Sequence, residues 1–154
     1  PFPGAKSCEL KMGVRLGQET YEPCGFFDRG VWYRGIIDLL IINGSLAWLI
    51  DYKTGKSAKY ADPKQLALMA SCIFFHFPEI ERVRSGLLFV VSKDFIPVDF
   101  GVKHRHDIFV KLDHVLTARD TAYESGVFNP KQNFTCRGWC PVVDCAHWQP
   151  KRGA

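Results

Sequence analysis

Apolar and polar residues alternate along residues 8–16, where charged residues or glycine separate the apolar positions. A period of two is typical of a strand with one buried face. Two further segments, 31–42 and 45–54, are also strand-like, and the dipeptide Asn43-Gly44 separates them. Asn-Gly is a strong signal for a two-residue turn of type I′, so we predict a β-hairpin here.

The turn sets the register of this hairpin. If the Asn-Gly pair is the whole loop, counting back along the strands places Asp38 opposite Leu49. Asp51 is then diagonal to Asp38 on the same face, about 7 to 8 Å away between Cα atoms, and Lys53 shares that face. A three-residue Asn-Gly-Ser loop would shift the pairing by one and turn Asp38 to the opposite face, unless a bulge restored it.

The rest of the chain predicts a helix, a second hairpin and another helix. Residues 62–77 repeat apolar positions with helical spacing, and Asp62 is a suitable N-cap. Segments 85–92 and 95–102 form the second hairpin, and 107–123 carries a helical pattern. We therefore predict an α/β fold with a mixed central β-sheet flanked by helices, followed by a Cys-rich C-terminal tail.

The 154 residues are 47% apolar and 23% charged, which fits one compact domain with a sizeable core. No apolar run reaches the roughly 18 to 20 residues that a membrane-spanning helix needs, and no secretory leader is visible. The first residue is Pro, so we expect a processed or excised chain that lacks upstream elements.

The net charge of +4 is mild, but the basic residues are unevenly distributed. An anionic partner and ordinary solvated loops are both compatible with this distribution. The two basic clusters are Lys53, Lys56, Lys59 and Lys64, and Lys103, His104, Arg105 and His106.

Six cysteines are present, and Cys136, Cys140 and Cys145 stand close together near the C-terminus. An even number suits disulfides in a secreted protein, but this spacing is similar to that of metal ligands. We expect a reducing, cytoplasmic environment and a metal or cluster site instead of three bridges. Cys72 lies within the first predicted helix, and we expect it to be a packed thiol.

Asp38, Asp51 and Lys53 suit phosphodiester hydrolysis. Mg²⁺ or Mn²⁺ held by carboxylates activates the attacking water and neutralises the phosphate. A lysine on the same face can orient or deprotonate the water, or stabilise charge on the phosphate. The alternative for Asp51 and Lys53 is an exposed ion pair on an edge strand. Asp38 is harder to explain without a partner, because a carboxylate in an apolar strand is costly to bury.

The segments GIIDLL, DYKTGK and QLALM, in this order, resemble the PD-(D/E)XK nuclease superfamily in its RecB-type branch. That branch includes phage and recombination exonucleases and the CRISPR adaptation nucleases. The resemblance covers about residues 9–70 and the terminal cysteines. It implies a restriction-endonuclease-like core at 1–130 with the tail, 131–154, packed on it. It also implies a Mg²⁺- or Mn²⁺-dependent deoxyribonuclease, with exonuclease action favoured.

By this resemblance Asp38 and Asp51 are metal ligands, and Tyr52 adds its backbone carbonyl. Lys53 is the catalytic lysine, and Gln65 positions the site or the DNA. Gln65 has an alternative role as the reciprocal partner of the N-cap in a capping box, because it stands three residues after that cap.

Glu9 is our choice for the upstream acid of the family, because it is on the polar side of its strand. Glu19 and Glu22 compete for this role, and Glu9 as a plain solvent-facing residue is the alternative. Met69 stands where the family's Gln-x-x-x-Tyr motif has its tyrosine, so a contact through that hydroxyl is lost. No helix precedes Glu9, although such a helix often completes the DNA groove in this family.

Some RecB-type nucleases end in three cysteines that hold an iron-sulfur cluster together with one distant cysteine. By resemblance the tail would bind a [4Fe–4S] cluster, and a Cys₃His zinc site is the alternative. The candidate ligands are Cys136, Cys140 and Cys145, joined by Cys8, Cys24 or His147.

The expected partner is DNA, as single- or double-stranded ends, together with a recombination or replication protein. Two rival functions remain: a non-catalytic nucleic-acid-binding adaptor of the same fold, and a metal-stapled structural domain. Aromatic residues of the first hairpin region could stack on bases, but we favour packing for them. The predicted DNA contacts are Lys56, Lys59, Lys103 and Arg105, and the aromatic residues are Phe26, Phe27, Trp32 and Tyr33.

Overall fold

The structure, a computed structural model, describes residues 3–18, 20–56, 58, 62–130 and 132–150. The chain divides into two compact units, Pro1–Asp113 and His114–Ala154. The division falls inside helix α2 (Asp107–Ser125), whereas the sequence interpretation placed it after residue 130. The β-sheet belongs to the first unit.

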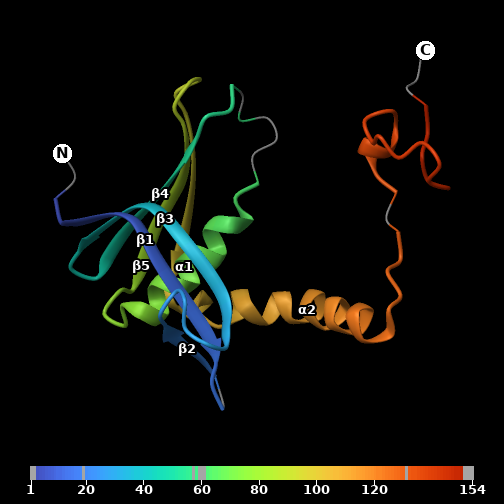
Figure 1. The fold of residues 1–154 in the computed structure, drawn as a ribbon. Helices are drawn as coiled ribbons and strands as arrows, with labels where there is room; N and C mark the ends of the chain where they lie inside the picture. The colour runs from blue at the N-terminus through green and yellow to red at the C-terminus, as the bar shows by residue number, and fades with distance from the viewer. Residues whose placement is uncertain (1–2, 19, 57, 59–61, 131, 151–154) are drawn as a thin grey trace. The chain divides into compact units, whose positions relative to one another are not determined.

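The first unit is built on a six-stranded mixed β-sheet, which confirms the predicted α/β class (Figure 1). The strand order is β2-β1-β3-β4-β5-β6, with β4 and β5 parallel and all other neighbours antiparallel. The short strand β2 was not predicted, because its four residues have no periodic pattern. The strands are β1 (Ala5–Leu16), β2 (Tyr21–Cys24), β3 (Val31–Asn43), β4 (Leu46–Lys53), β5 (Arg82–Phe89) and β6 (Asp94–Gly101).

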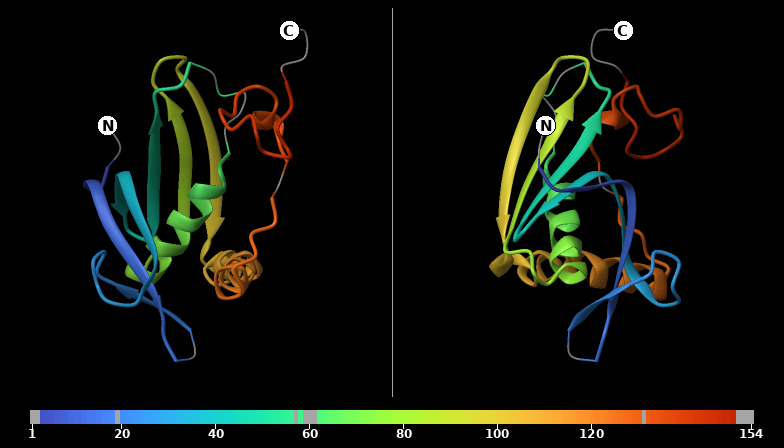
Figure 2. Two further views of the ribbon diagram at one scale, coloured as in Figure 1. Left: turned by 45° about the vertical axis from the view of Figure 1, so that its right-hand side comes forward. Right: turned by 90° about the vertical axis from the view of Figure 1, so that its left-hand side faces the viewer.

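Helix α1 (Lys64–His76) packs against the sheet, and the hydrophobic core lies between them (Figure 2). Its apolar stripe is buried as the helical spacing predicted. The helix begins one residue later than expected, with Pro63 at the N-cap position, and the Asp62 carboxylate accepts a hydrogen bond from the Lys64 N–H at 3.0 Å. The stripe residues with no exposed surface are Leu66, Ala70, Ile73 and Phe74.

Phe109, in the first turn of α2, is the centre of an aromatic cluster in this unit. Its ring centroid lies 5.0 Å from those of Tyr21 and Trp32, and 5.7 Å from that of Tyr33. Phe75 of α1 stacks on it at 5.8 Å. Offset and edge-on aromatic contacts of this kind stabilise packing beyond the area they bury. Trp32 and Tyr33 therefore serve packing, in agreement with the interpretation that we favoured.

The turn between β3 and β4 differs from the predicted one. Asn43 pairs with Leu46, so the two-residue loop is Gly44-Ser45. Gly44 has a φ of 60°, and Ser45 does not have a positive φ. A glycine with positive φ at the first loop position is the requirement of a type II′ turn, which replaces the type I′ turn expected from Asn-Gly. The pairing moves by two residues, so every side chain stays on its predicted face.

Strands β1 and β3 rotate about their own axes halfway along. Ile37 and Leu40 are both fully buried in the same core, although three residues separate them and side chains alternate with a period of two. On β1 the corresponding position is Glu9, whose φ of 52° is outside the extended range. The register around it is continuous, because Cys8 pairs with Leu39 and Leu10 pairs with Ile37. Figure 2 shows β1 changing direction along its length.

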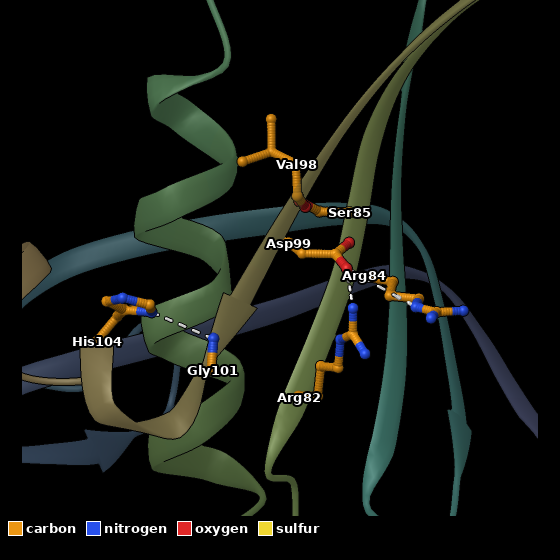
Figure 3. A network of polar contacts seen from close by, with 7 residues as sticks. All are labelled: Arg82, Arg84, Ser85, Val98, Asp99, Gly101 and His104. Atoms are coloured by element: carbon orange, nitrogen blue, oxygen red, sulfur yellow. Dashed lines mark hydrogen bonds and ion pairs between the residues drawn. The ribbon is translucent and has the colours of Figure 1, made fainter.

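The β5–β6 hairpin carries the second predicted basic cluster at one end. Asp99 bonds Arg82 across the hairpin and lies 3.8 Å from Arg84 (Figure 3). Beyond the end of β6, His104 turns back so that its Nδ1 accepts a hydrogen bond from the Gly101 N–H at 3.2 Å. The chain that carries Lys103 is therefore fixed to the end of the hairpin.

Helix α2 extends from Asp107 to Ser125, two residues beyond the predicted end. Phe109 is its one buried residue, and the acidic Asp107 in its first turn suits the positive end of the helix dipole. Of the helices in the described part of the chain, none has the combination of length and apolar character needed to cross a membrane.

Replacing Gly44 by Ala should lower the free energy of unfolding by about 1 kcal/mol, because a Cβ disfavours positive φ. No atom lies within 4 Å of that Cβ, so the cost is conformational and not steric. Urea denaturation measures the change. Asn43→Ala is the control and should change stability by less than about 0.5 kcal/mol. A larger loss for Asn43→Ala than for Gly44→Ala would support the type I′ turn and contradict the observed register.

Candidate active site

Asp38 and Asp51 lie on adjacent strands, each one residue beyond the last pair of the β3–β4 ladder. Leu39 pairs with Ile50, and extending this register by one residue places the two aspartates directly opposite each other. The predicted arrangement, with Asp38 opposite Leu49, was diagonal. Asp38 is held in place because its Oδ2 accepts a hydrogen bond from the Tyr52 N–H at 2.8 Å.

Asp51 is a buried carboxylate with a cation beside it. Only 6% of its surface is exposed, and its Oδ2 lies 2.7 Å from the ammonium nitrogen of Lys53. This oxygen is buried and makes no hydrogen bond of acceptable geometry within the described ranges. The ion pair is not an exposed pair on an edge strand, because β4 lies between β3 and β5 in the sheet. A buried carboxylate keeps its charge only where a cation or donors compensate the loss of water.

Gln65 connects helix α1 to this carboxylate. Its side-chain amide donates a hydrogen bond of 2.7 Å to Oδ1 of Asp51. The alternative capping-box role is therefore not adopted, since the amide turns toward the strand. Gln65 is the second residue of α1, so Asp51 also lies by the positive end of the helix dipole, which favours an anion.

Glu9 occupies the same row as the two aspartates by register, opposite Asp38. Its side chain is exposed, however, and its backbone is left-handed. Of the competing acids, Glu22 forms an ion pair with Arg15 at 3.1 Å, and Glu19 lies outside the described residues. Within the described ranges, no three His, Cys, Asp or Glu side chains stand close enough to hold one ion.

The predicted DNA contacts do not gather around this site. Lys56 is exposed three residues beyond Lys53, and Lys59 lies outside the described residues. Lys103 and Arg105 follow the end of β6, which is level with the start of β4 across the intervening strand β5. Asp51 is five residues along β4 from that start, which corresponds to about 17 Å. The second basic cluster is therefore at the opposite end of the sheet from Asp51.

The cysteines of the first unit differ in environment. Cys8 is exposed, whereas Cys72 is buried and burial raises the pKa of its thiol. The prediction of a packed thiol at Cys72 is confirmed. Burial, reinforced by the nearby Asp28 carboxylate, also raises the pKa of Cys24. A raised pKa disfavours the thiolate that binds metal, which weighs against Cys24 as a ligand.

In the second unit, backbone hydrogen bonds draw the tail cysteines into one small loop structure. The Cys136 carbonyl accepts a bond from the Gln149 N–H at 2.8 Å, and the Cys140 carbonyl accepts one from the Trp148 indole at 3.0 Å. The Trp148 N–H donates to the Cys145 carbonyl at 2.9 Å. These bonds organise the backbone of the tail, while its thiols remain free.

The donor set at Asp38 and Asp51 fits a divalent ion such as Mg²⁺ or Mn²⁺. Such ions prefer carboxylate and carbonyl oxygens and retain several waters. Asp51 Oδ2 is buried without a hydrogen bond, and the Lys53 ammonium beside it supplies the positive charge that a metal would otherwise supply. Tyr52, between the two charged residues of β4, is the candidate for a backbone carbonyl ligand.

No protein-family model matches the chain, and no curated protein matches it. Solved structures with a similar arrangement include the crystal structure of SSO0001, with 14% sequence identity and a TM-score of 0.41. That match covers 92% of this chain and 60% of the other. A similarity of this size supports no argument about function.

Gln65→Ala should lower the free energy of unfolding by about 1 to 3 kcal/mol, because it removes a hydrogen bond to a buried charge. Lys64→Ala is a matched control in the same turn of α1. The Lys64 side chain is 89% exposed, so the control should change stability by less than about 0.5 kcal/mol. Chemical denaturation at neutral pH measures both. Equal effects of the two substitutions would show that the Gln65–Asp51 bond contributes nothing specific.

Proposed function

We propose that this protein is a divalent-metal-dependent DNA nuclease of the PD-(D/E)XK type. One observation carries the proposal: two aspartates lie on adjacent strands, one fixed by the Tyr52 N–H and the other buried with a lysine 2.7 Å from its carboxylate. Structural ion pairs are usually exposed on both sides and contribute little, so a pair whose carboxylate is buried inside a sheet is better explained by chemistry. The resemblance of the three sequence segments to RecB-type nucleases gives the reaction class.

Each residue has a distinct part in this proposal. Asp38 and Asp51 supply the carboxylate oxygens that bind Mg²⁺ or Mn²⁺, which when bound activates water and neutralises the phosphate. Gln65 is a positioning residue, because it fixes Asp51 through Oδ1 and leaves Oδ2 for the ion. Lys53 is part of the same cluster and is one-third exposed, so its ammonium can reach a phosphate oxygen or the attacking water.

We propose DNA ends as the substrate and exonuclease action as the mode, on the basis of the resemblance to phage and recombination nucleases. Access from solvent on the face of Asp51 is supported by Lys53, whose side chain is 34% exposed. A polynucleotide backbone approaching Lys53 meets both a cation and the proposed metal-binding carboxylates. Lys56 is close enough in sequence to contact a neighbouring phosphate.

Asp51→Asn should reduce cleavage at least about 100-fold, since it weakens metal binding while keeping the shape of the side chain. The assay is digestion of linear DNA labelled separately at each 5′ and 3′ end, with Mg²⁺, Mn²⁺ or EDTA. Asp99→Asn is the matched control, because Asp99 is also a strand aspartate paired with basic residues. Wild-type cleavage by Asp51→Asn would refute the site. A folded wild-type protein that binds DNA without cutting it would be an adaptor.

We propose in addition that the tail cysteines bind an iron-sulfur cluster or zinc. The spacing of Cys136, Cys140 and Cys145 and the hydrogen bonds that gather their backbone support this proposal. Cys140→Ala should lower the melting temperature by several degrees and abolish bound iron or zinc in elemental analysis. Cys72→Ala is the control for the loss of a thiol and should leave the metal content unchanged. Identical metal content in wild type and Cys140→Ala would exclude the tail as a ligand set.

A further inference from the structure

The loop between β2 and β3 presents two adjacent aromatic residues on a tight turn. Phe26 and Phe27 are its central residues, and the Asp28 N–H closes the turn with a 3.1 Å hydrogen bond to the Gly25 carbonyl. The Asp28 carboxylate accepts a second bond, of 2.8 Å, from the Gly25 N–H. Gly25 and Asp28 are thus joined by two hydrogen bonds, which fix the backbone of the two phenylalanines between them.

Phe27 is 79% exposed, so it is not part of the hydrophobic core. Its ring meets that of Phe26 edge-on, with the centroids 4.9 Å apart. Phenylalanine side chains are usually buried. A ring that an ordered turn holds in solvent buries no apolar surface and therefore does not stabilise the fold. The packing explanation that holds for Trp32 and Tyr33 therefore does not extend to Phe27.

Two cations surround the pair. The Lys11 ammonium lies 5.9 Å from the Phe26 centroid and 5.6 Å from that of Phe27. The Arg34 guanidinium lies 6.0 Å from the Phe26 centroid, and its Nε donates a 2.7 Å hydrogen bond to the Phe26 carbonyl. Within the described part of the chain, neither cation forms an ion pair with a carboxylate, so both charges remain available to an anion.

The surface formed by Phe26, Phe27, Lys11 and Arg34 lies close to the candidate active site along strands β1 and β3. Lys11 is paired with Ile36, which is 38% exposed, and the row of Glu9 and Asp38 is two residues further on. Two residues of strand correspond to about 7 Å. Lys11, Ile36 and Glu9 are all exposed, and the left-handed backbone of Glu9 interrupts the alternation of side chains on β1 at this point.

We propose that Phe26, Phe27, Lys11 and Arg34 form a binding platform for single-stranded DNA that feeds the site at Asp38 and Asp51. Unpaired bases stack on exposed aromatic rings, and flanking cations bind the phosphates. Duplex DNA cannot use the rings in this way, because its bases are already stacked on one another. The proposal rests on the proposed nuclease function for the choice of DNA as the polymer, and it assigns the unpaired strand as the form that is bound.

The test is binding of fluorescein-labelled oligothymidylate of about 20 nucleotides, measured by anisotropy in EDTA so that no cleavage occurs. Phe27→Ala should raise the Kd for this strand roughly 5- to 150-fold, the range measured for loss of one stacked base. The Kd for a duplex of equal length should change less than about twofold. Phe134→Ala is the matched control, because Phe134 is 77% exposed but lies in the second unit; it should leave both affinities unchanged.

Lys11→Gln tests the ionic part of the platform without touching the turn. It should weaken single-strand binding and lower the slope of log K against log salt by about 0.7, the contribution of one phosphate contact on a single strand. Circular dichroism of each variant verifies folding. An unchanged Kd in folded Phe27→Ala, or equal losses for single strand and duplex, would overturn the platform. So would a change of oligomeric state in Phe27→Ala with unaltered DNA affinity, since that outcome assigns the rings to self-association.

Cleavage is scored separately, so the two proposals fail independently. Single-strand binding that depends on Phe27, in a protein that cuts nothing with Mg²⁺ or Mn²⁺, would keep the platform and refute the nuclease. Duplex cleavage that depends on Asp51, with no loss of single-strand affinity in Phe27→Ala, would keep the nuclease and refute the platform.

Discussion

The register of β3 against β4 is the constraint on which the rest of the candidate site depends. Side chains alternate along a strand, so a slip by one residue would move Asp38 to the opposite face from Asp51. The Gly44-Ser45 turn fixes the pairing as far as Leu39 and Ile50, and the next residue on each strand is an aspartate. Such a pair of like charges is unfavourable unless cations accompany it. Lys53 compensates the charge of Asp51, and a backbone N–H stabilises that of Asp38.

The burial of Asp51 distinguishes this arrangement from an ordinary surface ion pair. The core between α1 and the sheet is apolar, with fully buried residues such as Leu49 two positions before Asp51 on the same face of β4. The carboxylate therefore lies at the edge of a dry interior, where electrostatic interactions are strong and an unpaired charge is costly. Gln65 satisfies one oxygen from the helix side, and the other faces the lysine. The stability of the first unit and the geometry of the candidate site thus depend on the same few contacts.

The positively charged and aromatic features of the chain have separate roles in the structure. Trp32 and Tyr33 pack around Phe109, whereas Phe27 is held in solvent by a closed turn. The basic segment at Lys103 lies at the far end of the sheet from Asp51, while Lys11 lies near it along the strands. The amino-acid composition does not distinguish one lysine or one aromatic residue from another. Only their positions in the sheet show which of them lie near the candidate site.

Local periodicity and chain direction were enough to predict every strand of the sheet except β2, both hairpins, the helices α1 and α2, and the shared face of Asp51 and Lys53. The predicted loop was one residue too early, which shifts the cross-strand pairing by two residues and so preserves the alternation of faces. The bond from Gln65 to Asp51, the edge strand β2, the left-handed backbone of Glu9 and the exposure of Phe27 were decided only by tertiary structure. Each depends on contacts between segments far apart in the chain, and no local pattern encodes such contacts.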